Sequence, residues 1–133
     1  MIVVDASAMV AALLGGDARA DAALTHLHSH APWYAPAHMP VEVVRTFAKL
    51  QHAGLATAEA AEGLAMQMHR GVGAAVVLTG TRELLPEIWR LRHNISPYDG
   101  AYVALAAHLG APLLTADRRL AKAAIGLAEV LEI

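Results

Sequence analysis

The chain has 133 residues, a formal net charge of −2 and no cysteine. A chain of this length fits one domain, here residues 1–133, and buries roughly two thirds of its unfolded surface. The lack of cysteine excludes disulfides, thiol catalysis and cysteine-bound zinc, and the weak negative charge excludes binding of nucleic acid through bulk positive potential alone.

The sequence contains no apolar run that approaches the ~20 residues needed to span a bilayer. The longest such run near the N-terminus, Ala6 to Gly16, is bounded by Asp5 and Asp17. The opening residues also lack the basic segment that begins a secretory signal. We therefore expect a cytoplasmic protein without a membrane partner.

Short apolar runs alternate with amphipathic stretches along the chain, which predicts βαβ units around a mainly parallel sheet. Five runs are expected to form strands: Met1 to Val4, Pro32 to Pro36, Ala74 to Leu78, Pro112 to Thr115 and Glu129 to Glu132.

The segments between these strands carry the start and stop signals of helices. Polar residues that cap helix N-termini stand at five places: Ser7, Asp17, Thr57, Thr81 and Ser96. Pro40 and Pro97 suit first helical turns, and glycines follow the helices. The predicted helices run from Ser7 to about Leu14, Asp17 to about His28, Pro40 to about His52, Thr57 to the glycines at 71 and 73, Thr81 to about His93, Ser96 to about Leu109, and Asp117 to Ala124.

Four carboxylates stand where a strand or a turn gives way to a helix: Asp5, Glu42, Asp99 and Asp117. Parallel strands bring such junctions to one edge of the sheet, where α/β proteins bind ligands, so the sequence predicts one acidic pocket. Taken alone, Asp99 and Asp117 would each fit a purely structural role at a helix N-terminus, an effect of about 0.3–1 kcal/mol. Like charges at about 4 Å cost roughly 4 kcal/mol per pair at an effective dielectric of ~20, which favours a bound cation.

Oxygen ligands suit Mg²⁺ or Mn²⁺, and two divalent ions would balance four carboxylates. Such a site activates water and clamps both oxygens of an in-line displacement at a phosphodiester, so we predict metal-dependent nucleic-acid hydrolysis. We hypothesise that Asp5 and Asp99 hold the principal ion, while Glu42 and Asp117 help to hold a second ion or orient water. The expected products carry 5′-phosphate and 3′-hydroxyl groups.

Four runs resemble PIN-domain ribonucleases, specifically VapC-type toxins of bacterial toxin–antitoxin pairs: Val3 to Ser7, Val41 to Val43, Tyr98 to Ala106 and Leu113 to Ala121. The resemblance covers the whole chain in order, spacing and length. It implies an α/β three-layer sandwich, with a mainly parallel central sheet of about five strands flanked by helices. It also implies an endoribonuclease that uses Mg²⁺ or Mn²⁺. The family usually has alanine where Gly100 stands, which costs up to about 1 kcal/mol in helix propensity.

The resemblance assigns metal binding to Asp5, Glu42, Asp99 and Asp117, and a supporting role to Ser7 and Thr115. It also implies two protein partners, a VapB-like antitoxin that lies across the active-site groove and a second copy of the chain in a homodimer. Arg118 and Arg119 are candidates for RNA phosphate contact, and a solvated helix face is an equally good reading.

The histidines contribute little to the prediction of a metal site. His26 and His30 share a helix face but lack a third metal ligand nearby, and His38, four residues before Glu42, fits a turn or capping role better than a place in the pocket. The non-enzymatic alternative is a catalytically silent PIN-like module that binds RNA or a partner. A phosphatase of the haloacid dehalogenase type would need a second aspartate where Ser7 stands.

Overall fold

A computed structural model describes the backbone of residues 1–133 and the side chains of residues 1–71 and 74–133. Its centre is a five-stranded sheet in the order β3-β2-β1-β4-β5, and every pairing is parallel. The strands are β1 (Ile2–Val4), β2 (Trp33–Pro36), β3 (Val76–Thr79), β4 (Leu113–Thr115) and β5 (Val130–Glu132). The α/β fold with a parallel sheet of five strands is therefore confirmed.

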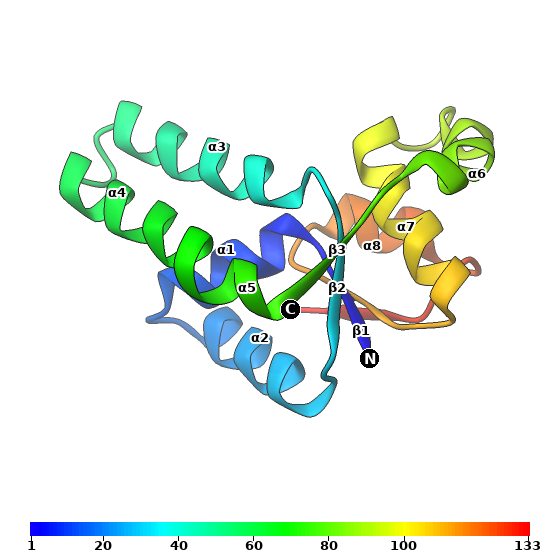
Figure 1. Cartoon of the computed structure of the whole chain (residues 1–133), viewed down its shortest axis with the longest axis horizontal. Coiled ribbons are helices and arrows are strands. Elements are labelled where there is room, and N and C mark those ends of the chain that lie inside the picture. The colour runs from blue at the N-terminus through cyan, green and yellow to red at the C-terminus, as the bar shows by residue number, and fades with distance from the viewer.

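Helices cover both faces of this sheet. They are α1 (Ala6–Leu14), α2 (Ala18–Ser29), α3 (Met39–His52), α4 (Ala58–Gln67), α5 (Gly73–Ala75), α6 (Leu85–Leu91), α7 (Pro97–Leu109) and α8 (Arg118–Ala124), with a π-helical turn η1 (Met68–Val72) and a 3₁₀ turn η2 (Arg82–Leu84). In Figure 1, α1 to α5 lie on one side of the strands, and α6, α7 and α8 lie on the other. This is the expected three-layer arrangement.

Strand order creates a switch point between β1 and β4. From β1 the chain continues through α1 and α2 to β2, which lies toward one edge of the sheet. From β4 it continues through α8 to β5, which lies at the other edge. The loops that follow β1 and β4 therefore diverge above the sheet, and such a crevice is where open α/β sheets bind ligands. Asp5 stands in the first of these loops and Asp117 in the second.

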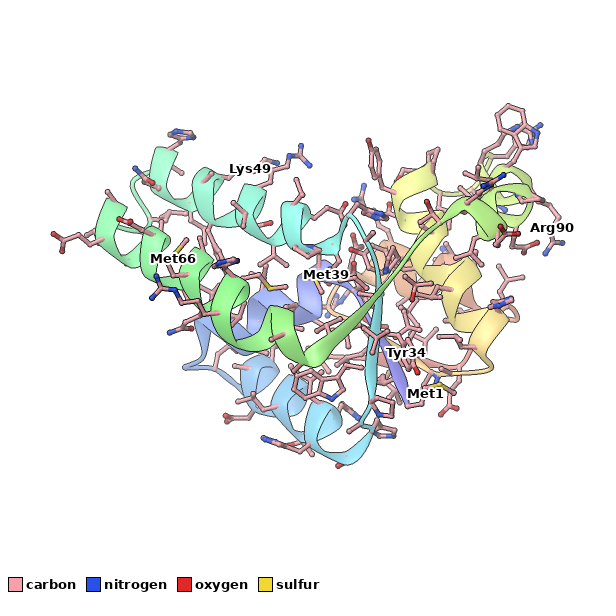
Figure 2. All side chains as sticks on the ribbon, in the orientation of Figure 1. Met1, Tyr34, Met39, Lys49, Met66 and Arg90 are labelled. Carbon is pink, nitrogen blue, oxygen red and sulfur yellow. The ribbon has the colours of Figure 1, made fainter. Side chains whose placement is uncertain are left out.

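The neighbouring strands β1 and β4 are apolar except for Thr115 at the end of β4, because both of their faces are covered. All residues of β1 are fully buried, and so are Leu113 and Leu114 of β4. Helix α7 is buried from Gly100 to Ala106 and contacts both β1 and β2. Met39, at the start of α3, is also fully buried, while Lys49 lies on the outer side of the same helix (Figure 2).

Three predicted helix signals were wrong. Asp5, not Ser7, is the N-cap of α1, because the Asp5 carboxylate accepts the backbone N–H of Ser7. Thr81 makes no capping hydrogen bond, since its backbone is already helical and leads into the 3₁₀ turn η2. The glycines at 71 and 73 do not end the helical path, which continues through η1 and α5 to Ala75 because glycine costs a helix only about 1 kcal/mol.

The other helix boundaries agree with the sequence to within a few residues, including the N-caps Asp17, Thr57 and Ser96 and the first-turn prolines of α3 and α7. Among the described residues, no helix combines the length and the apolar character that a membrane crossing requires.

Candidate functional site

Asp5 is a buried carboxylate held by hydroxyl groups from the start of α1 and the end of β4. The residue is only 5 % exposed. Its Oδ2 accepts hydrogen bonds from Ser7 Oγ, from Ser7 N at 3.2 Å and from Thr115 Oγ1 at 2.8 Å. All three donors reach Oδ2, and no donor among the described residues reaches Oδ1. The second carboxylate oxygen is thus left for a ligand in the cavity that Asp5 lines.

The same two hydroxyls join the loop after β1 to the loop after β4. Ser7 Oγ accepts the backbone N–H of Ala116 at 2.9 Å, and Thr115 Oγ1 accepts that of Asp117 at 3.0 Å. Each hydroxyl therefore donates to Asp5 while it accepts a backbone N–H from the loop after β4. This arrangement fixes the orientation of Asp5 relative to Asp117 across the switch point.

Burial raises the pKa of Asp5 above its ordinary value, because the ionised carboxylate loses hydration. The hydrogen bonds from Ser7 and Thr115 lower the pKa and partly offset this effect, while the negative charge of Glu42 raises it further. A cation near Oδ1 would favour the ionised form, so the electrostatics of this carboxylate suit a positively charged ligand.

Glu42, in the first turn of α3, is positioned by Tyr102 of α7. The Tyr102 hydroxyl donates a hydrogen bond of 2.5 Å to Glu42 Oε2. Burial, followed by that hydrogen bond, raises the pKa of Tyr102, so the phenol keeps its proton and acts as a donor. This contact joins the helices on opposite faces of the sheet at the site.

His38 stands in a turn and is the N-cap residue of α3, as the sequence predicted, and its side chain also lies at this site. The side chain makes no capping hydrogen bond to α3, and its ring lies edge-on to both Tyr98 and Tyr102, with centroids 5.3 Å away in each case. Its Nε2 lies 3.7 Å from Glu42 Oε2 and is, among the described side chains, the buried polar atom that lacks a hydrogen-bond partner.

Tyr102→Phe is expected to lower the free energy of unfolding by about 1.5–3 kcal/mol, the usual contribution of a hydrogen bond to a charged group. The change removes the donor to Glu42 and leaves the buried ring in place. Urea denaturation checks this value. An unchanged midpoint would mean that water replaces the phenol at Glu42 without loss.

Asp99 lies in the first turn of α7 and Asp117 is the N-cap of α8, as the simpler interpretation of the sequence required. Ser96 Oγ donates to Asp99 Oδ2 at 2.9 Å and accepts from Asp99 N at 3.1 Å in a reciprocal pair at the start of α7. Asp117 Oδ1 accepts the backbone N–H groups of Arg119 at 2.8 Å and Leu120 at 3.3 Å at the start of α8. These caps fix both carboxylates in place.

The four predicted acids line two cavities. The first, of about 430 Å³, is lined by Asp5, Glu42 and Asp117 among others, together with Ser7 and with Asp17 of the α2 N-cap. The second, of about 460 Å³, is lined by Glu42 and Asp99. Glu42 and Arg45 line both. Within the described part of the chain, no three acidic or imidazole side chains converge on a single point.

The side chains of Arg118 and Arg119 pair with different acidic residues. Arg119 Nη2 lies 3.6 Å from Asp117 Oδ2 and its residue lines the second cavity, whereas Arg118 Nε lies 3.6 Å from Glu132 Oε1 of β5. His26 and His30 contact each other, with His30 Nδ1 2.9 Å from the carbonyl oxygen of His26, and line neither acidic cavity.

Sequence reasoning missed Tyr102 and Arg45. A local signal existed for both, since Tyr102 stands three residues after Asp99 and Arg45 three residues after Glu42, which places each pair on one helix face. Nothing local could join Tyr102 to Glu42, because 60 residues separate them.

Comparison with known proteins places this chain in a family. The model of the PIN domain matches residues 2–126. Ribonuclease VapC9 of Mycobacterium tuberculosis is 40% identical over 122 residues, covering 90% of this chain and 88% of VapC9. Ribonuclease VapC3 of the same species is 34% identical over 122 residues, covering 92% and 86%.

Solved structures show the same fold. FitAcB of Neisseria gonorrhoeae superposes with a TM-score of 0.76 at 17% identity, over 99% of this chain and 97% of that one. VapC20 of Mycobacterium tuberculosis, described as a toxin that cleaves the sarcin–ricin loop, gives a TM-score of 0.66 at 24% identity, over 92% and 95%.

Proposed function

The chain belongs to the PIN-domain family and has VapC ribonucleases among its relatives, and from this premise we propose that it is a metal-dependent endoribonuclease, the toxin of a toxin–antitoxin pair. The observation that carries the proposal is the buried Asp5, which Ser7 and Thr115 hold at the switch point with one oxygen left over. Glu42 and Asp117 line the same cavity.

The donor set fits a hard divalent cation such as Mg²⁺ or Mn²⁺. Every charged candidate ligand is a carboxylate, and oxygen ligands are those that these ions prefer. The raised pKa of Asp5 is a second supporting feature, because a buried carboxylate without a neighbouring positive charge is unfavourable in its ionised form. Asp5, Glu42, Asp99 and Asp117 are the residues that would hold the metal.

A bound divalent ion supplies an acidic water and neutralises charge on the phosphate. The protein then has to position the reacting groups. Ser7 and Thr115 hold the Asp5 carboxylate in a single orientation, and Tyr102 occupies Glu42 Oε2 and so leaves Oε1 to accept a hydrogen bond from the attacking water. Hydrogen bonds at the starts of α7 and α8 fix Asp99 and Asp117. Asp117 adds negative charge to the first cavity and Asp99 adds it to the second.

The partners follow from the same family membership. We propose a VapB-like antitoxin, RNA as the substrate, a homodimer, and action in the cytoplasm by a single domain spanning residues 1–133. Arg119, on the edge of the second cavity, is a better candidate than Arg118 for RNA phosphate contact, since Arg118 pairs with Glu132 away from both cavities.

Purified protein without antitoxin is expected to cut total cellular RNA into discrete fragments when Mg²⁺ or Mn²⁺ is present. The fragments should carry 5′-phosphate and 3′-hydroxyl ends, and EDTA should abolish them, because the carboxylates alone cannot activate water. Gel analysis followed by end-specific ligation checks both points.

The alternative function is a silent module that binds RNA or a protein partner. Folded protein whose thermal unfolding responds to Mn²⁺, but which produces no fragments from total RNA, would favour that alternative.

A further inference from the structure

The second cavity contains more than acidic residues. Its lining comes from α3, from the loop before α7, from the first turn of α7 and from α8, and the residues used below are Glu42, Arg45, Tyr98, Asp99 and Arg119. We call it the Tyr98 cavity. It adjoins the cavity of Asp5 through Glu42 and Arg45, which line both. Whatever occupies the Tyr98 cavity is therefore next to the proposed cleavage site.

Tyr98 presents an exposed aromatic ring at this place. The residue is 63 % exposed, although it lies in the first turn of a helix that is otherwise largely buried. His38 contacts its ring at 5.3 Å between centroids and at an angle of 75°, so the ring has a packed neighbour that restricts its orientation. A single exposed aromatic residue is common, but one held beside a polar cavity is a suitable surface for stacking a planar group.

Arg45 adds a cation between the two cavities. It stands one turn after Glu42 on α3, and it makes no ion pair among the described residues, whereas the neighbouring Arg119 pairs with Asp117. A guanidinium group binds phosphate through two parallel hydrogen bonds. The Tyr98 cavity therefore offers a stacking surface and a phosphate-binding group from different helices.

We propose that the Tyr98 cavity binds one unpaired nucleotide of the RNA next to the cleaved bond, with its base stacked on Tyr98 and its phosphate bound by Arg45. The inference rests on the proposed function and narrows its substrate class to single-stranded or looped RNA. A base inside a duplex is stacked on its neighbours and cannot lie on the Tyr98 ring without leaving the helix.

The experiment measures RNA binding without cleavage. A fluorescent single strand of roughly 12 nucleotides, within the range of single-strand binding sites, is titrated with protein in EDTA, and a duplex of the same sequence is titrated in parallel. Tyr98→Leu should weaken binding of the single strand about tenfold, the usual effect of losing one stacked base, and should leave duplex binding unchanged. Tyr98→Phe keeps the ring and should bind as the unmodified protein does.

Arg45→Gln tests the phosphate contact. It should weaken binding of the single strand and reduce the salt dependence of log K by about 0.7–1. The matched control is Lys49→Gln, because Lys49 lies one turn further along α3 and lines neither cavity. Thermal unfolding of each variant shows that the chain is folded, which is expected since both cavity residues are exposed.

The proposal is overturned if Tyr98→Leu binds the single strand as well as the unmodified protein does, or if it loses single strand and duplex equally. It is also overturned if the unmodified protein binds neither RNA, in which case the cavity serves a protein partner. A selective loss in Tyr98→Leu supports the cavity even where Mg²⁺ produces no cleavage, so failure of the catalytic proposal is distinguished from failure of this one.

Discussion

Asp99→Asn is expected to lower the rate of RNA cleavage by about 100- to 1000-fold, the loss typical when one group that stabilises charge in the transition state is removed. We do not expect this substitution to unfold the chain. Asp99 interacts with Ser96 through one carboxylate oxygen and its backbone N–H, and an asparagine side chain can accept the same hydrogen bond. Initial cleavage rates in Mg²⁺, measured beside thermal unfolding curves, provide the check.

The matched control for this variant is Asp17→Asn. Asp17 lines the cavity of Asp5, which adjoins the Tyr98 cavity that Asp99 lines, and it caps α2 by accepting the backbone N–H of Ala20 at 2.9 Å. Asparagine caps helices as well as aspartate does, so this variant removes a negative charge from the adjoining cavity without affecting its helix. Retained cleavage in Asp17→Asn is expected. If both variants lost the same activity, general electrostatics would explain the effect and Asp99 would have no special role.

The sheet and most helices could be predicted because their signals are local. The strands β1 and β4 are short apolar runs, and they are buried on both faces as such runs in parallel sheets are. Ser96 and Pro97 together mark the start of α7, and the structure shows the expected cap. The parallel sheet then brings the loops after β1 and β4 together, so the proximity of Asp5 and Asp117 followed from topology alone.

The errors and omissions concern contacts between distant parts of the chain. Ser7 fits the local pattern of an N-cap, but its hydroxyl donates to Asp5 and accepts from Ala116, 109 residues away, so the cap of α1 falls to Asp5. The prediction of His38 in a turn is confirmed, but the sequence could not place Tyr98 and Tyr102 of α7 beside its ring. Such pairings depend on the packed fold.

Asp5→Asn is expected to stabilise the protein in the absence of metal. Burial raises the pKa of Asp5 in the folded chain above its value in the unfolded chain. Between those two pKa values the folded chain binds more protons than the unfolded chain, so the free energy of unfolding falls as the pH rises through this window. Above both pKa values the full destabilisation is present. Asparagine cannot ionise, and the variant should therefore lose this part of the pH dependence.

Metal should reverse the order of stability of the unmodified protein and Asp5→Asn. In EDTA, urea denaturation from about pH 4 to about pH 8 should show Asp5→Asn as the more stable chain at the upper end. Mg²⁺ at about 100 times its dissociation constant should then raise the free energy of unfolding of the unmodified protein by about 2.7 kcal/mol, since it binds only the folded chain. Asp5→Asn should not respond to the same concentration. A variant less stable than the unmodified protein in EDTA would show instead that the hydrogen bonds of Ser7 and Thr115 to the ionised carboxylate outweigh its burial, so that Asp5 supports the fold even without a cation.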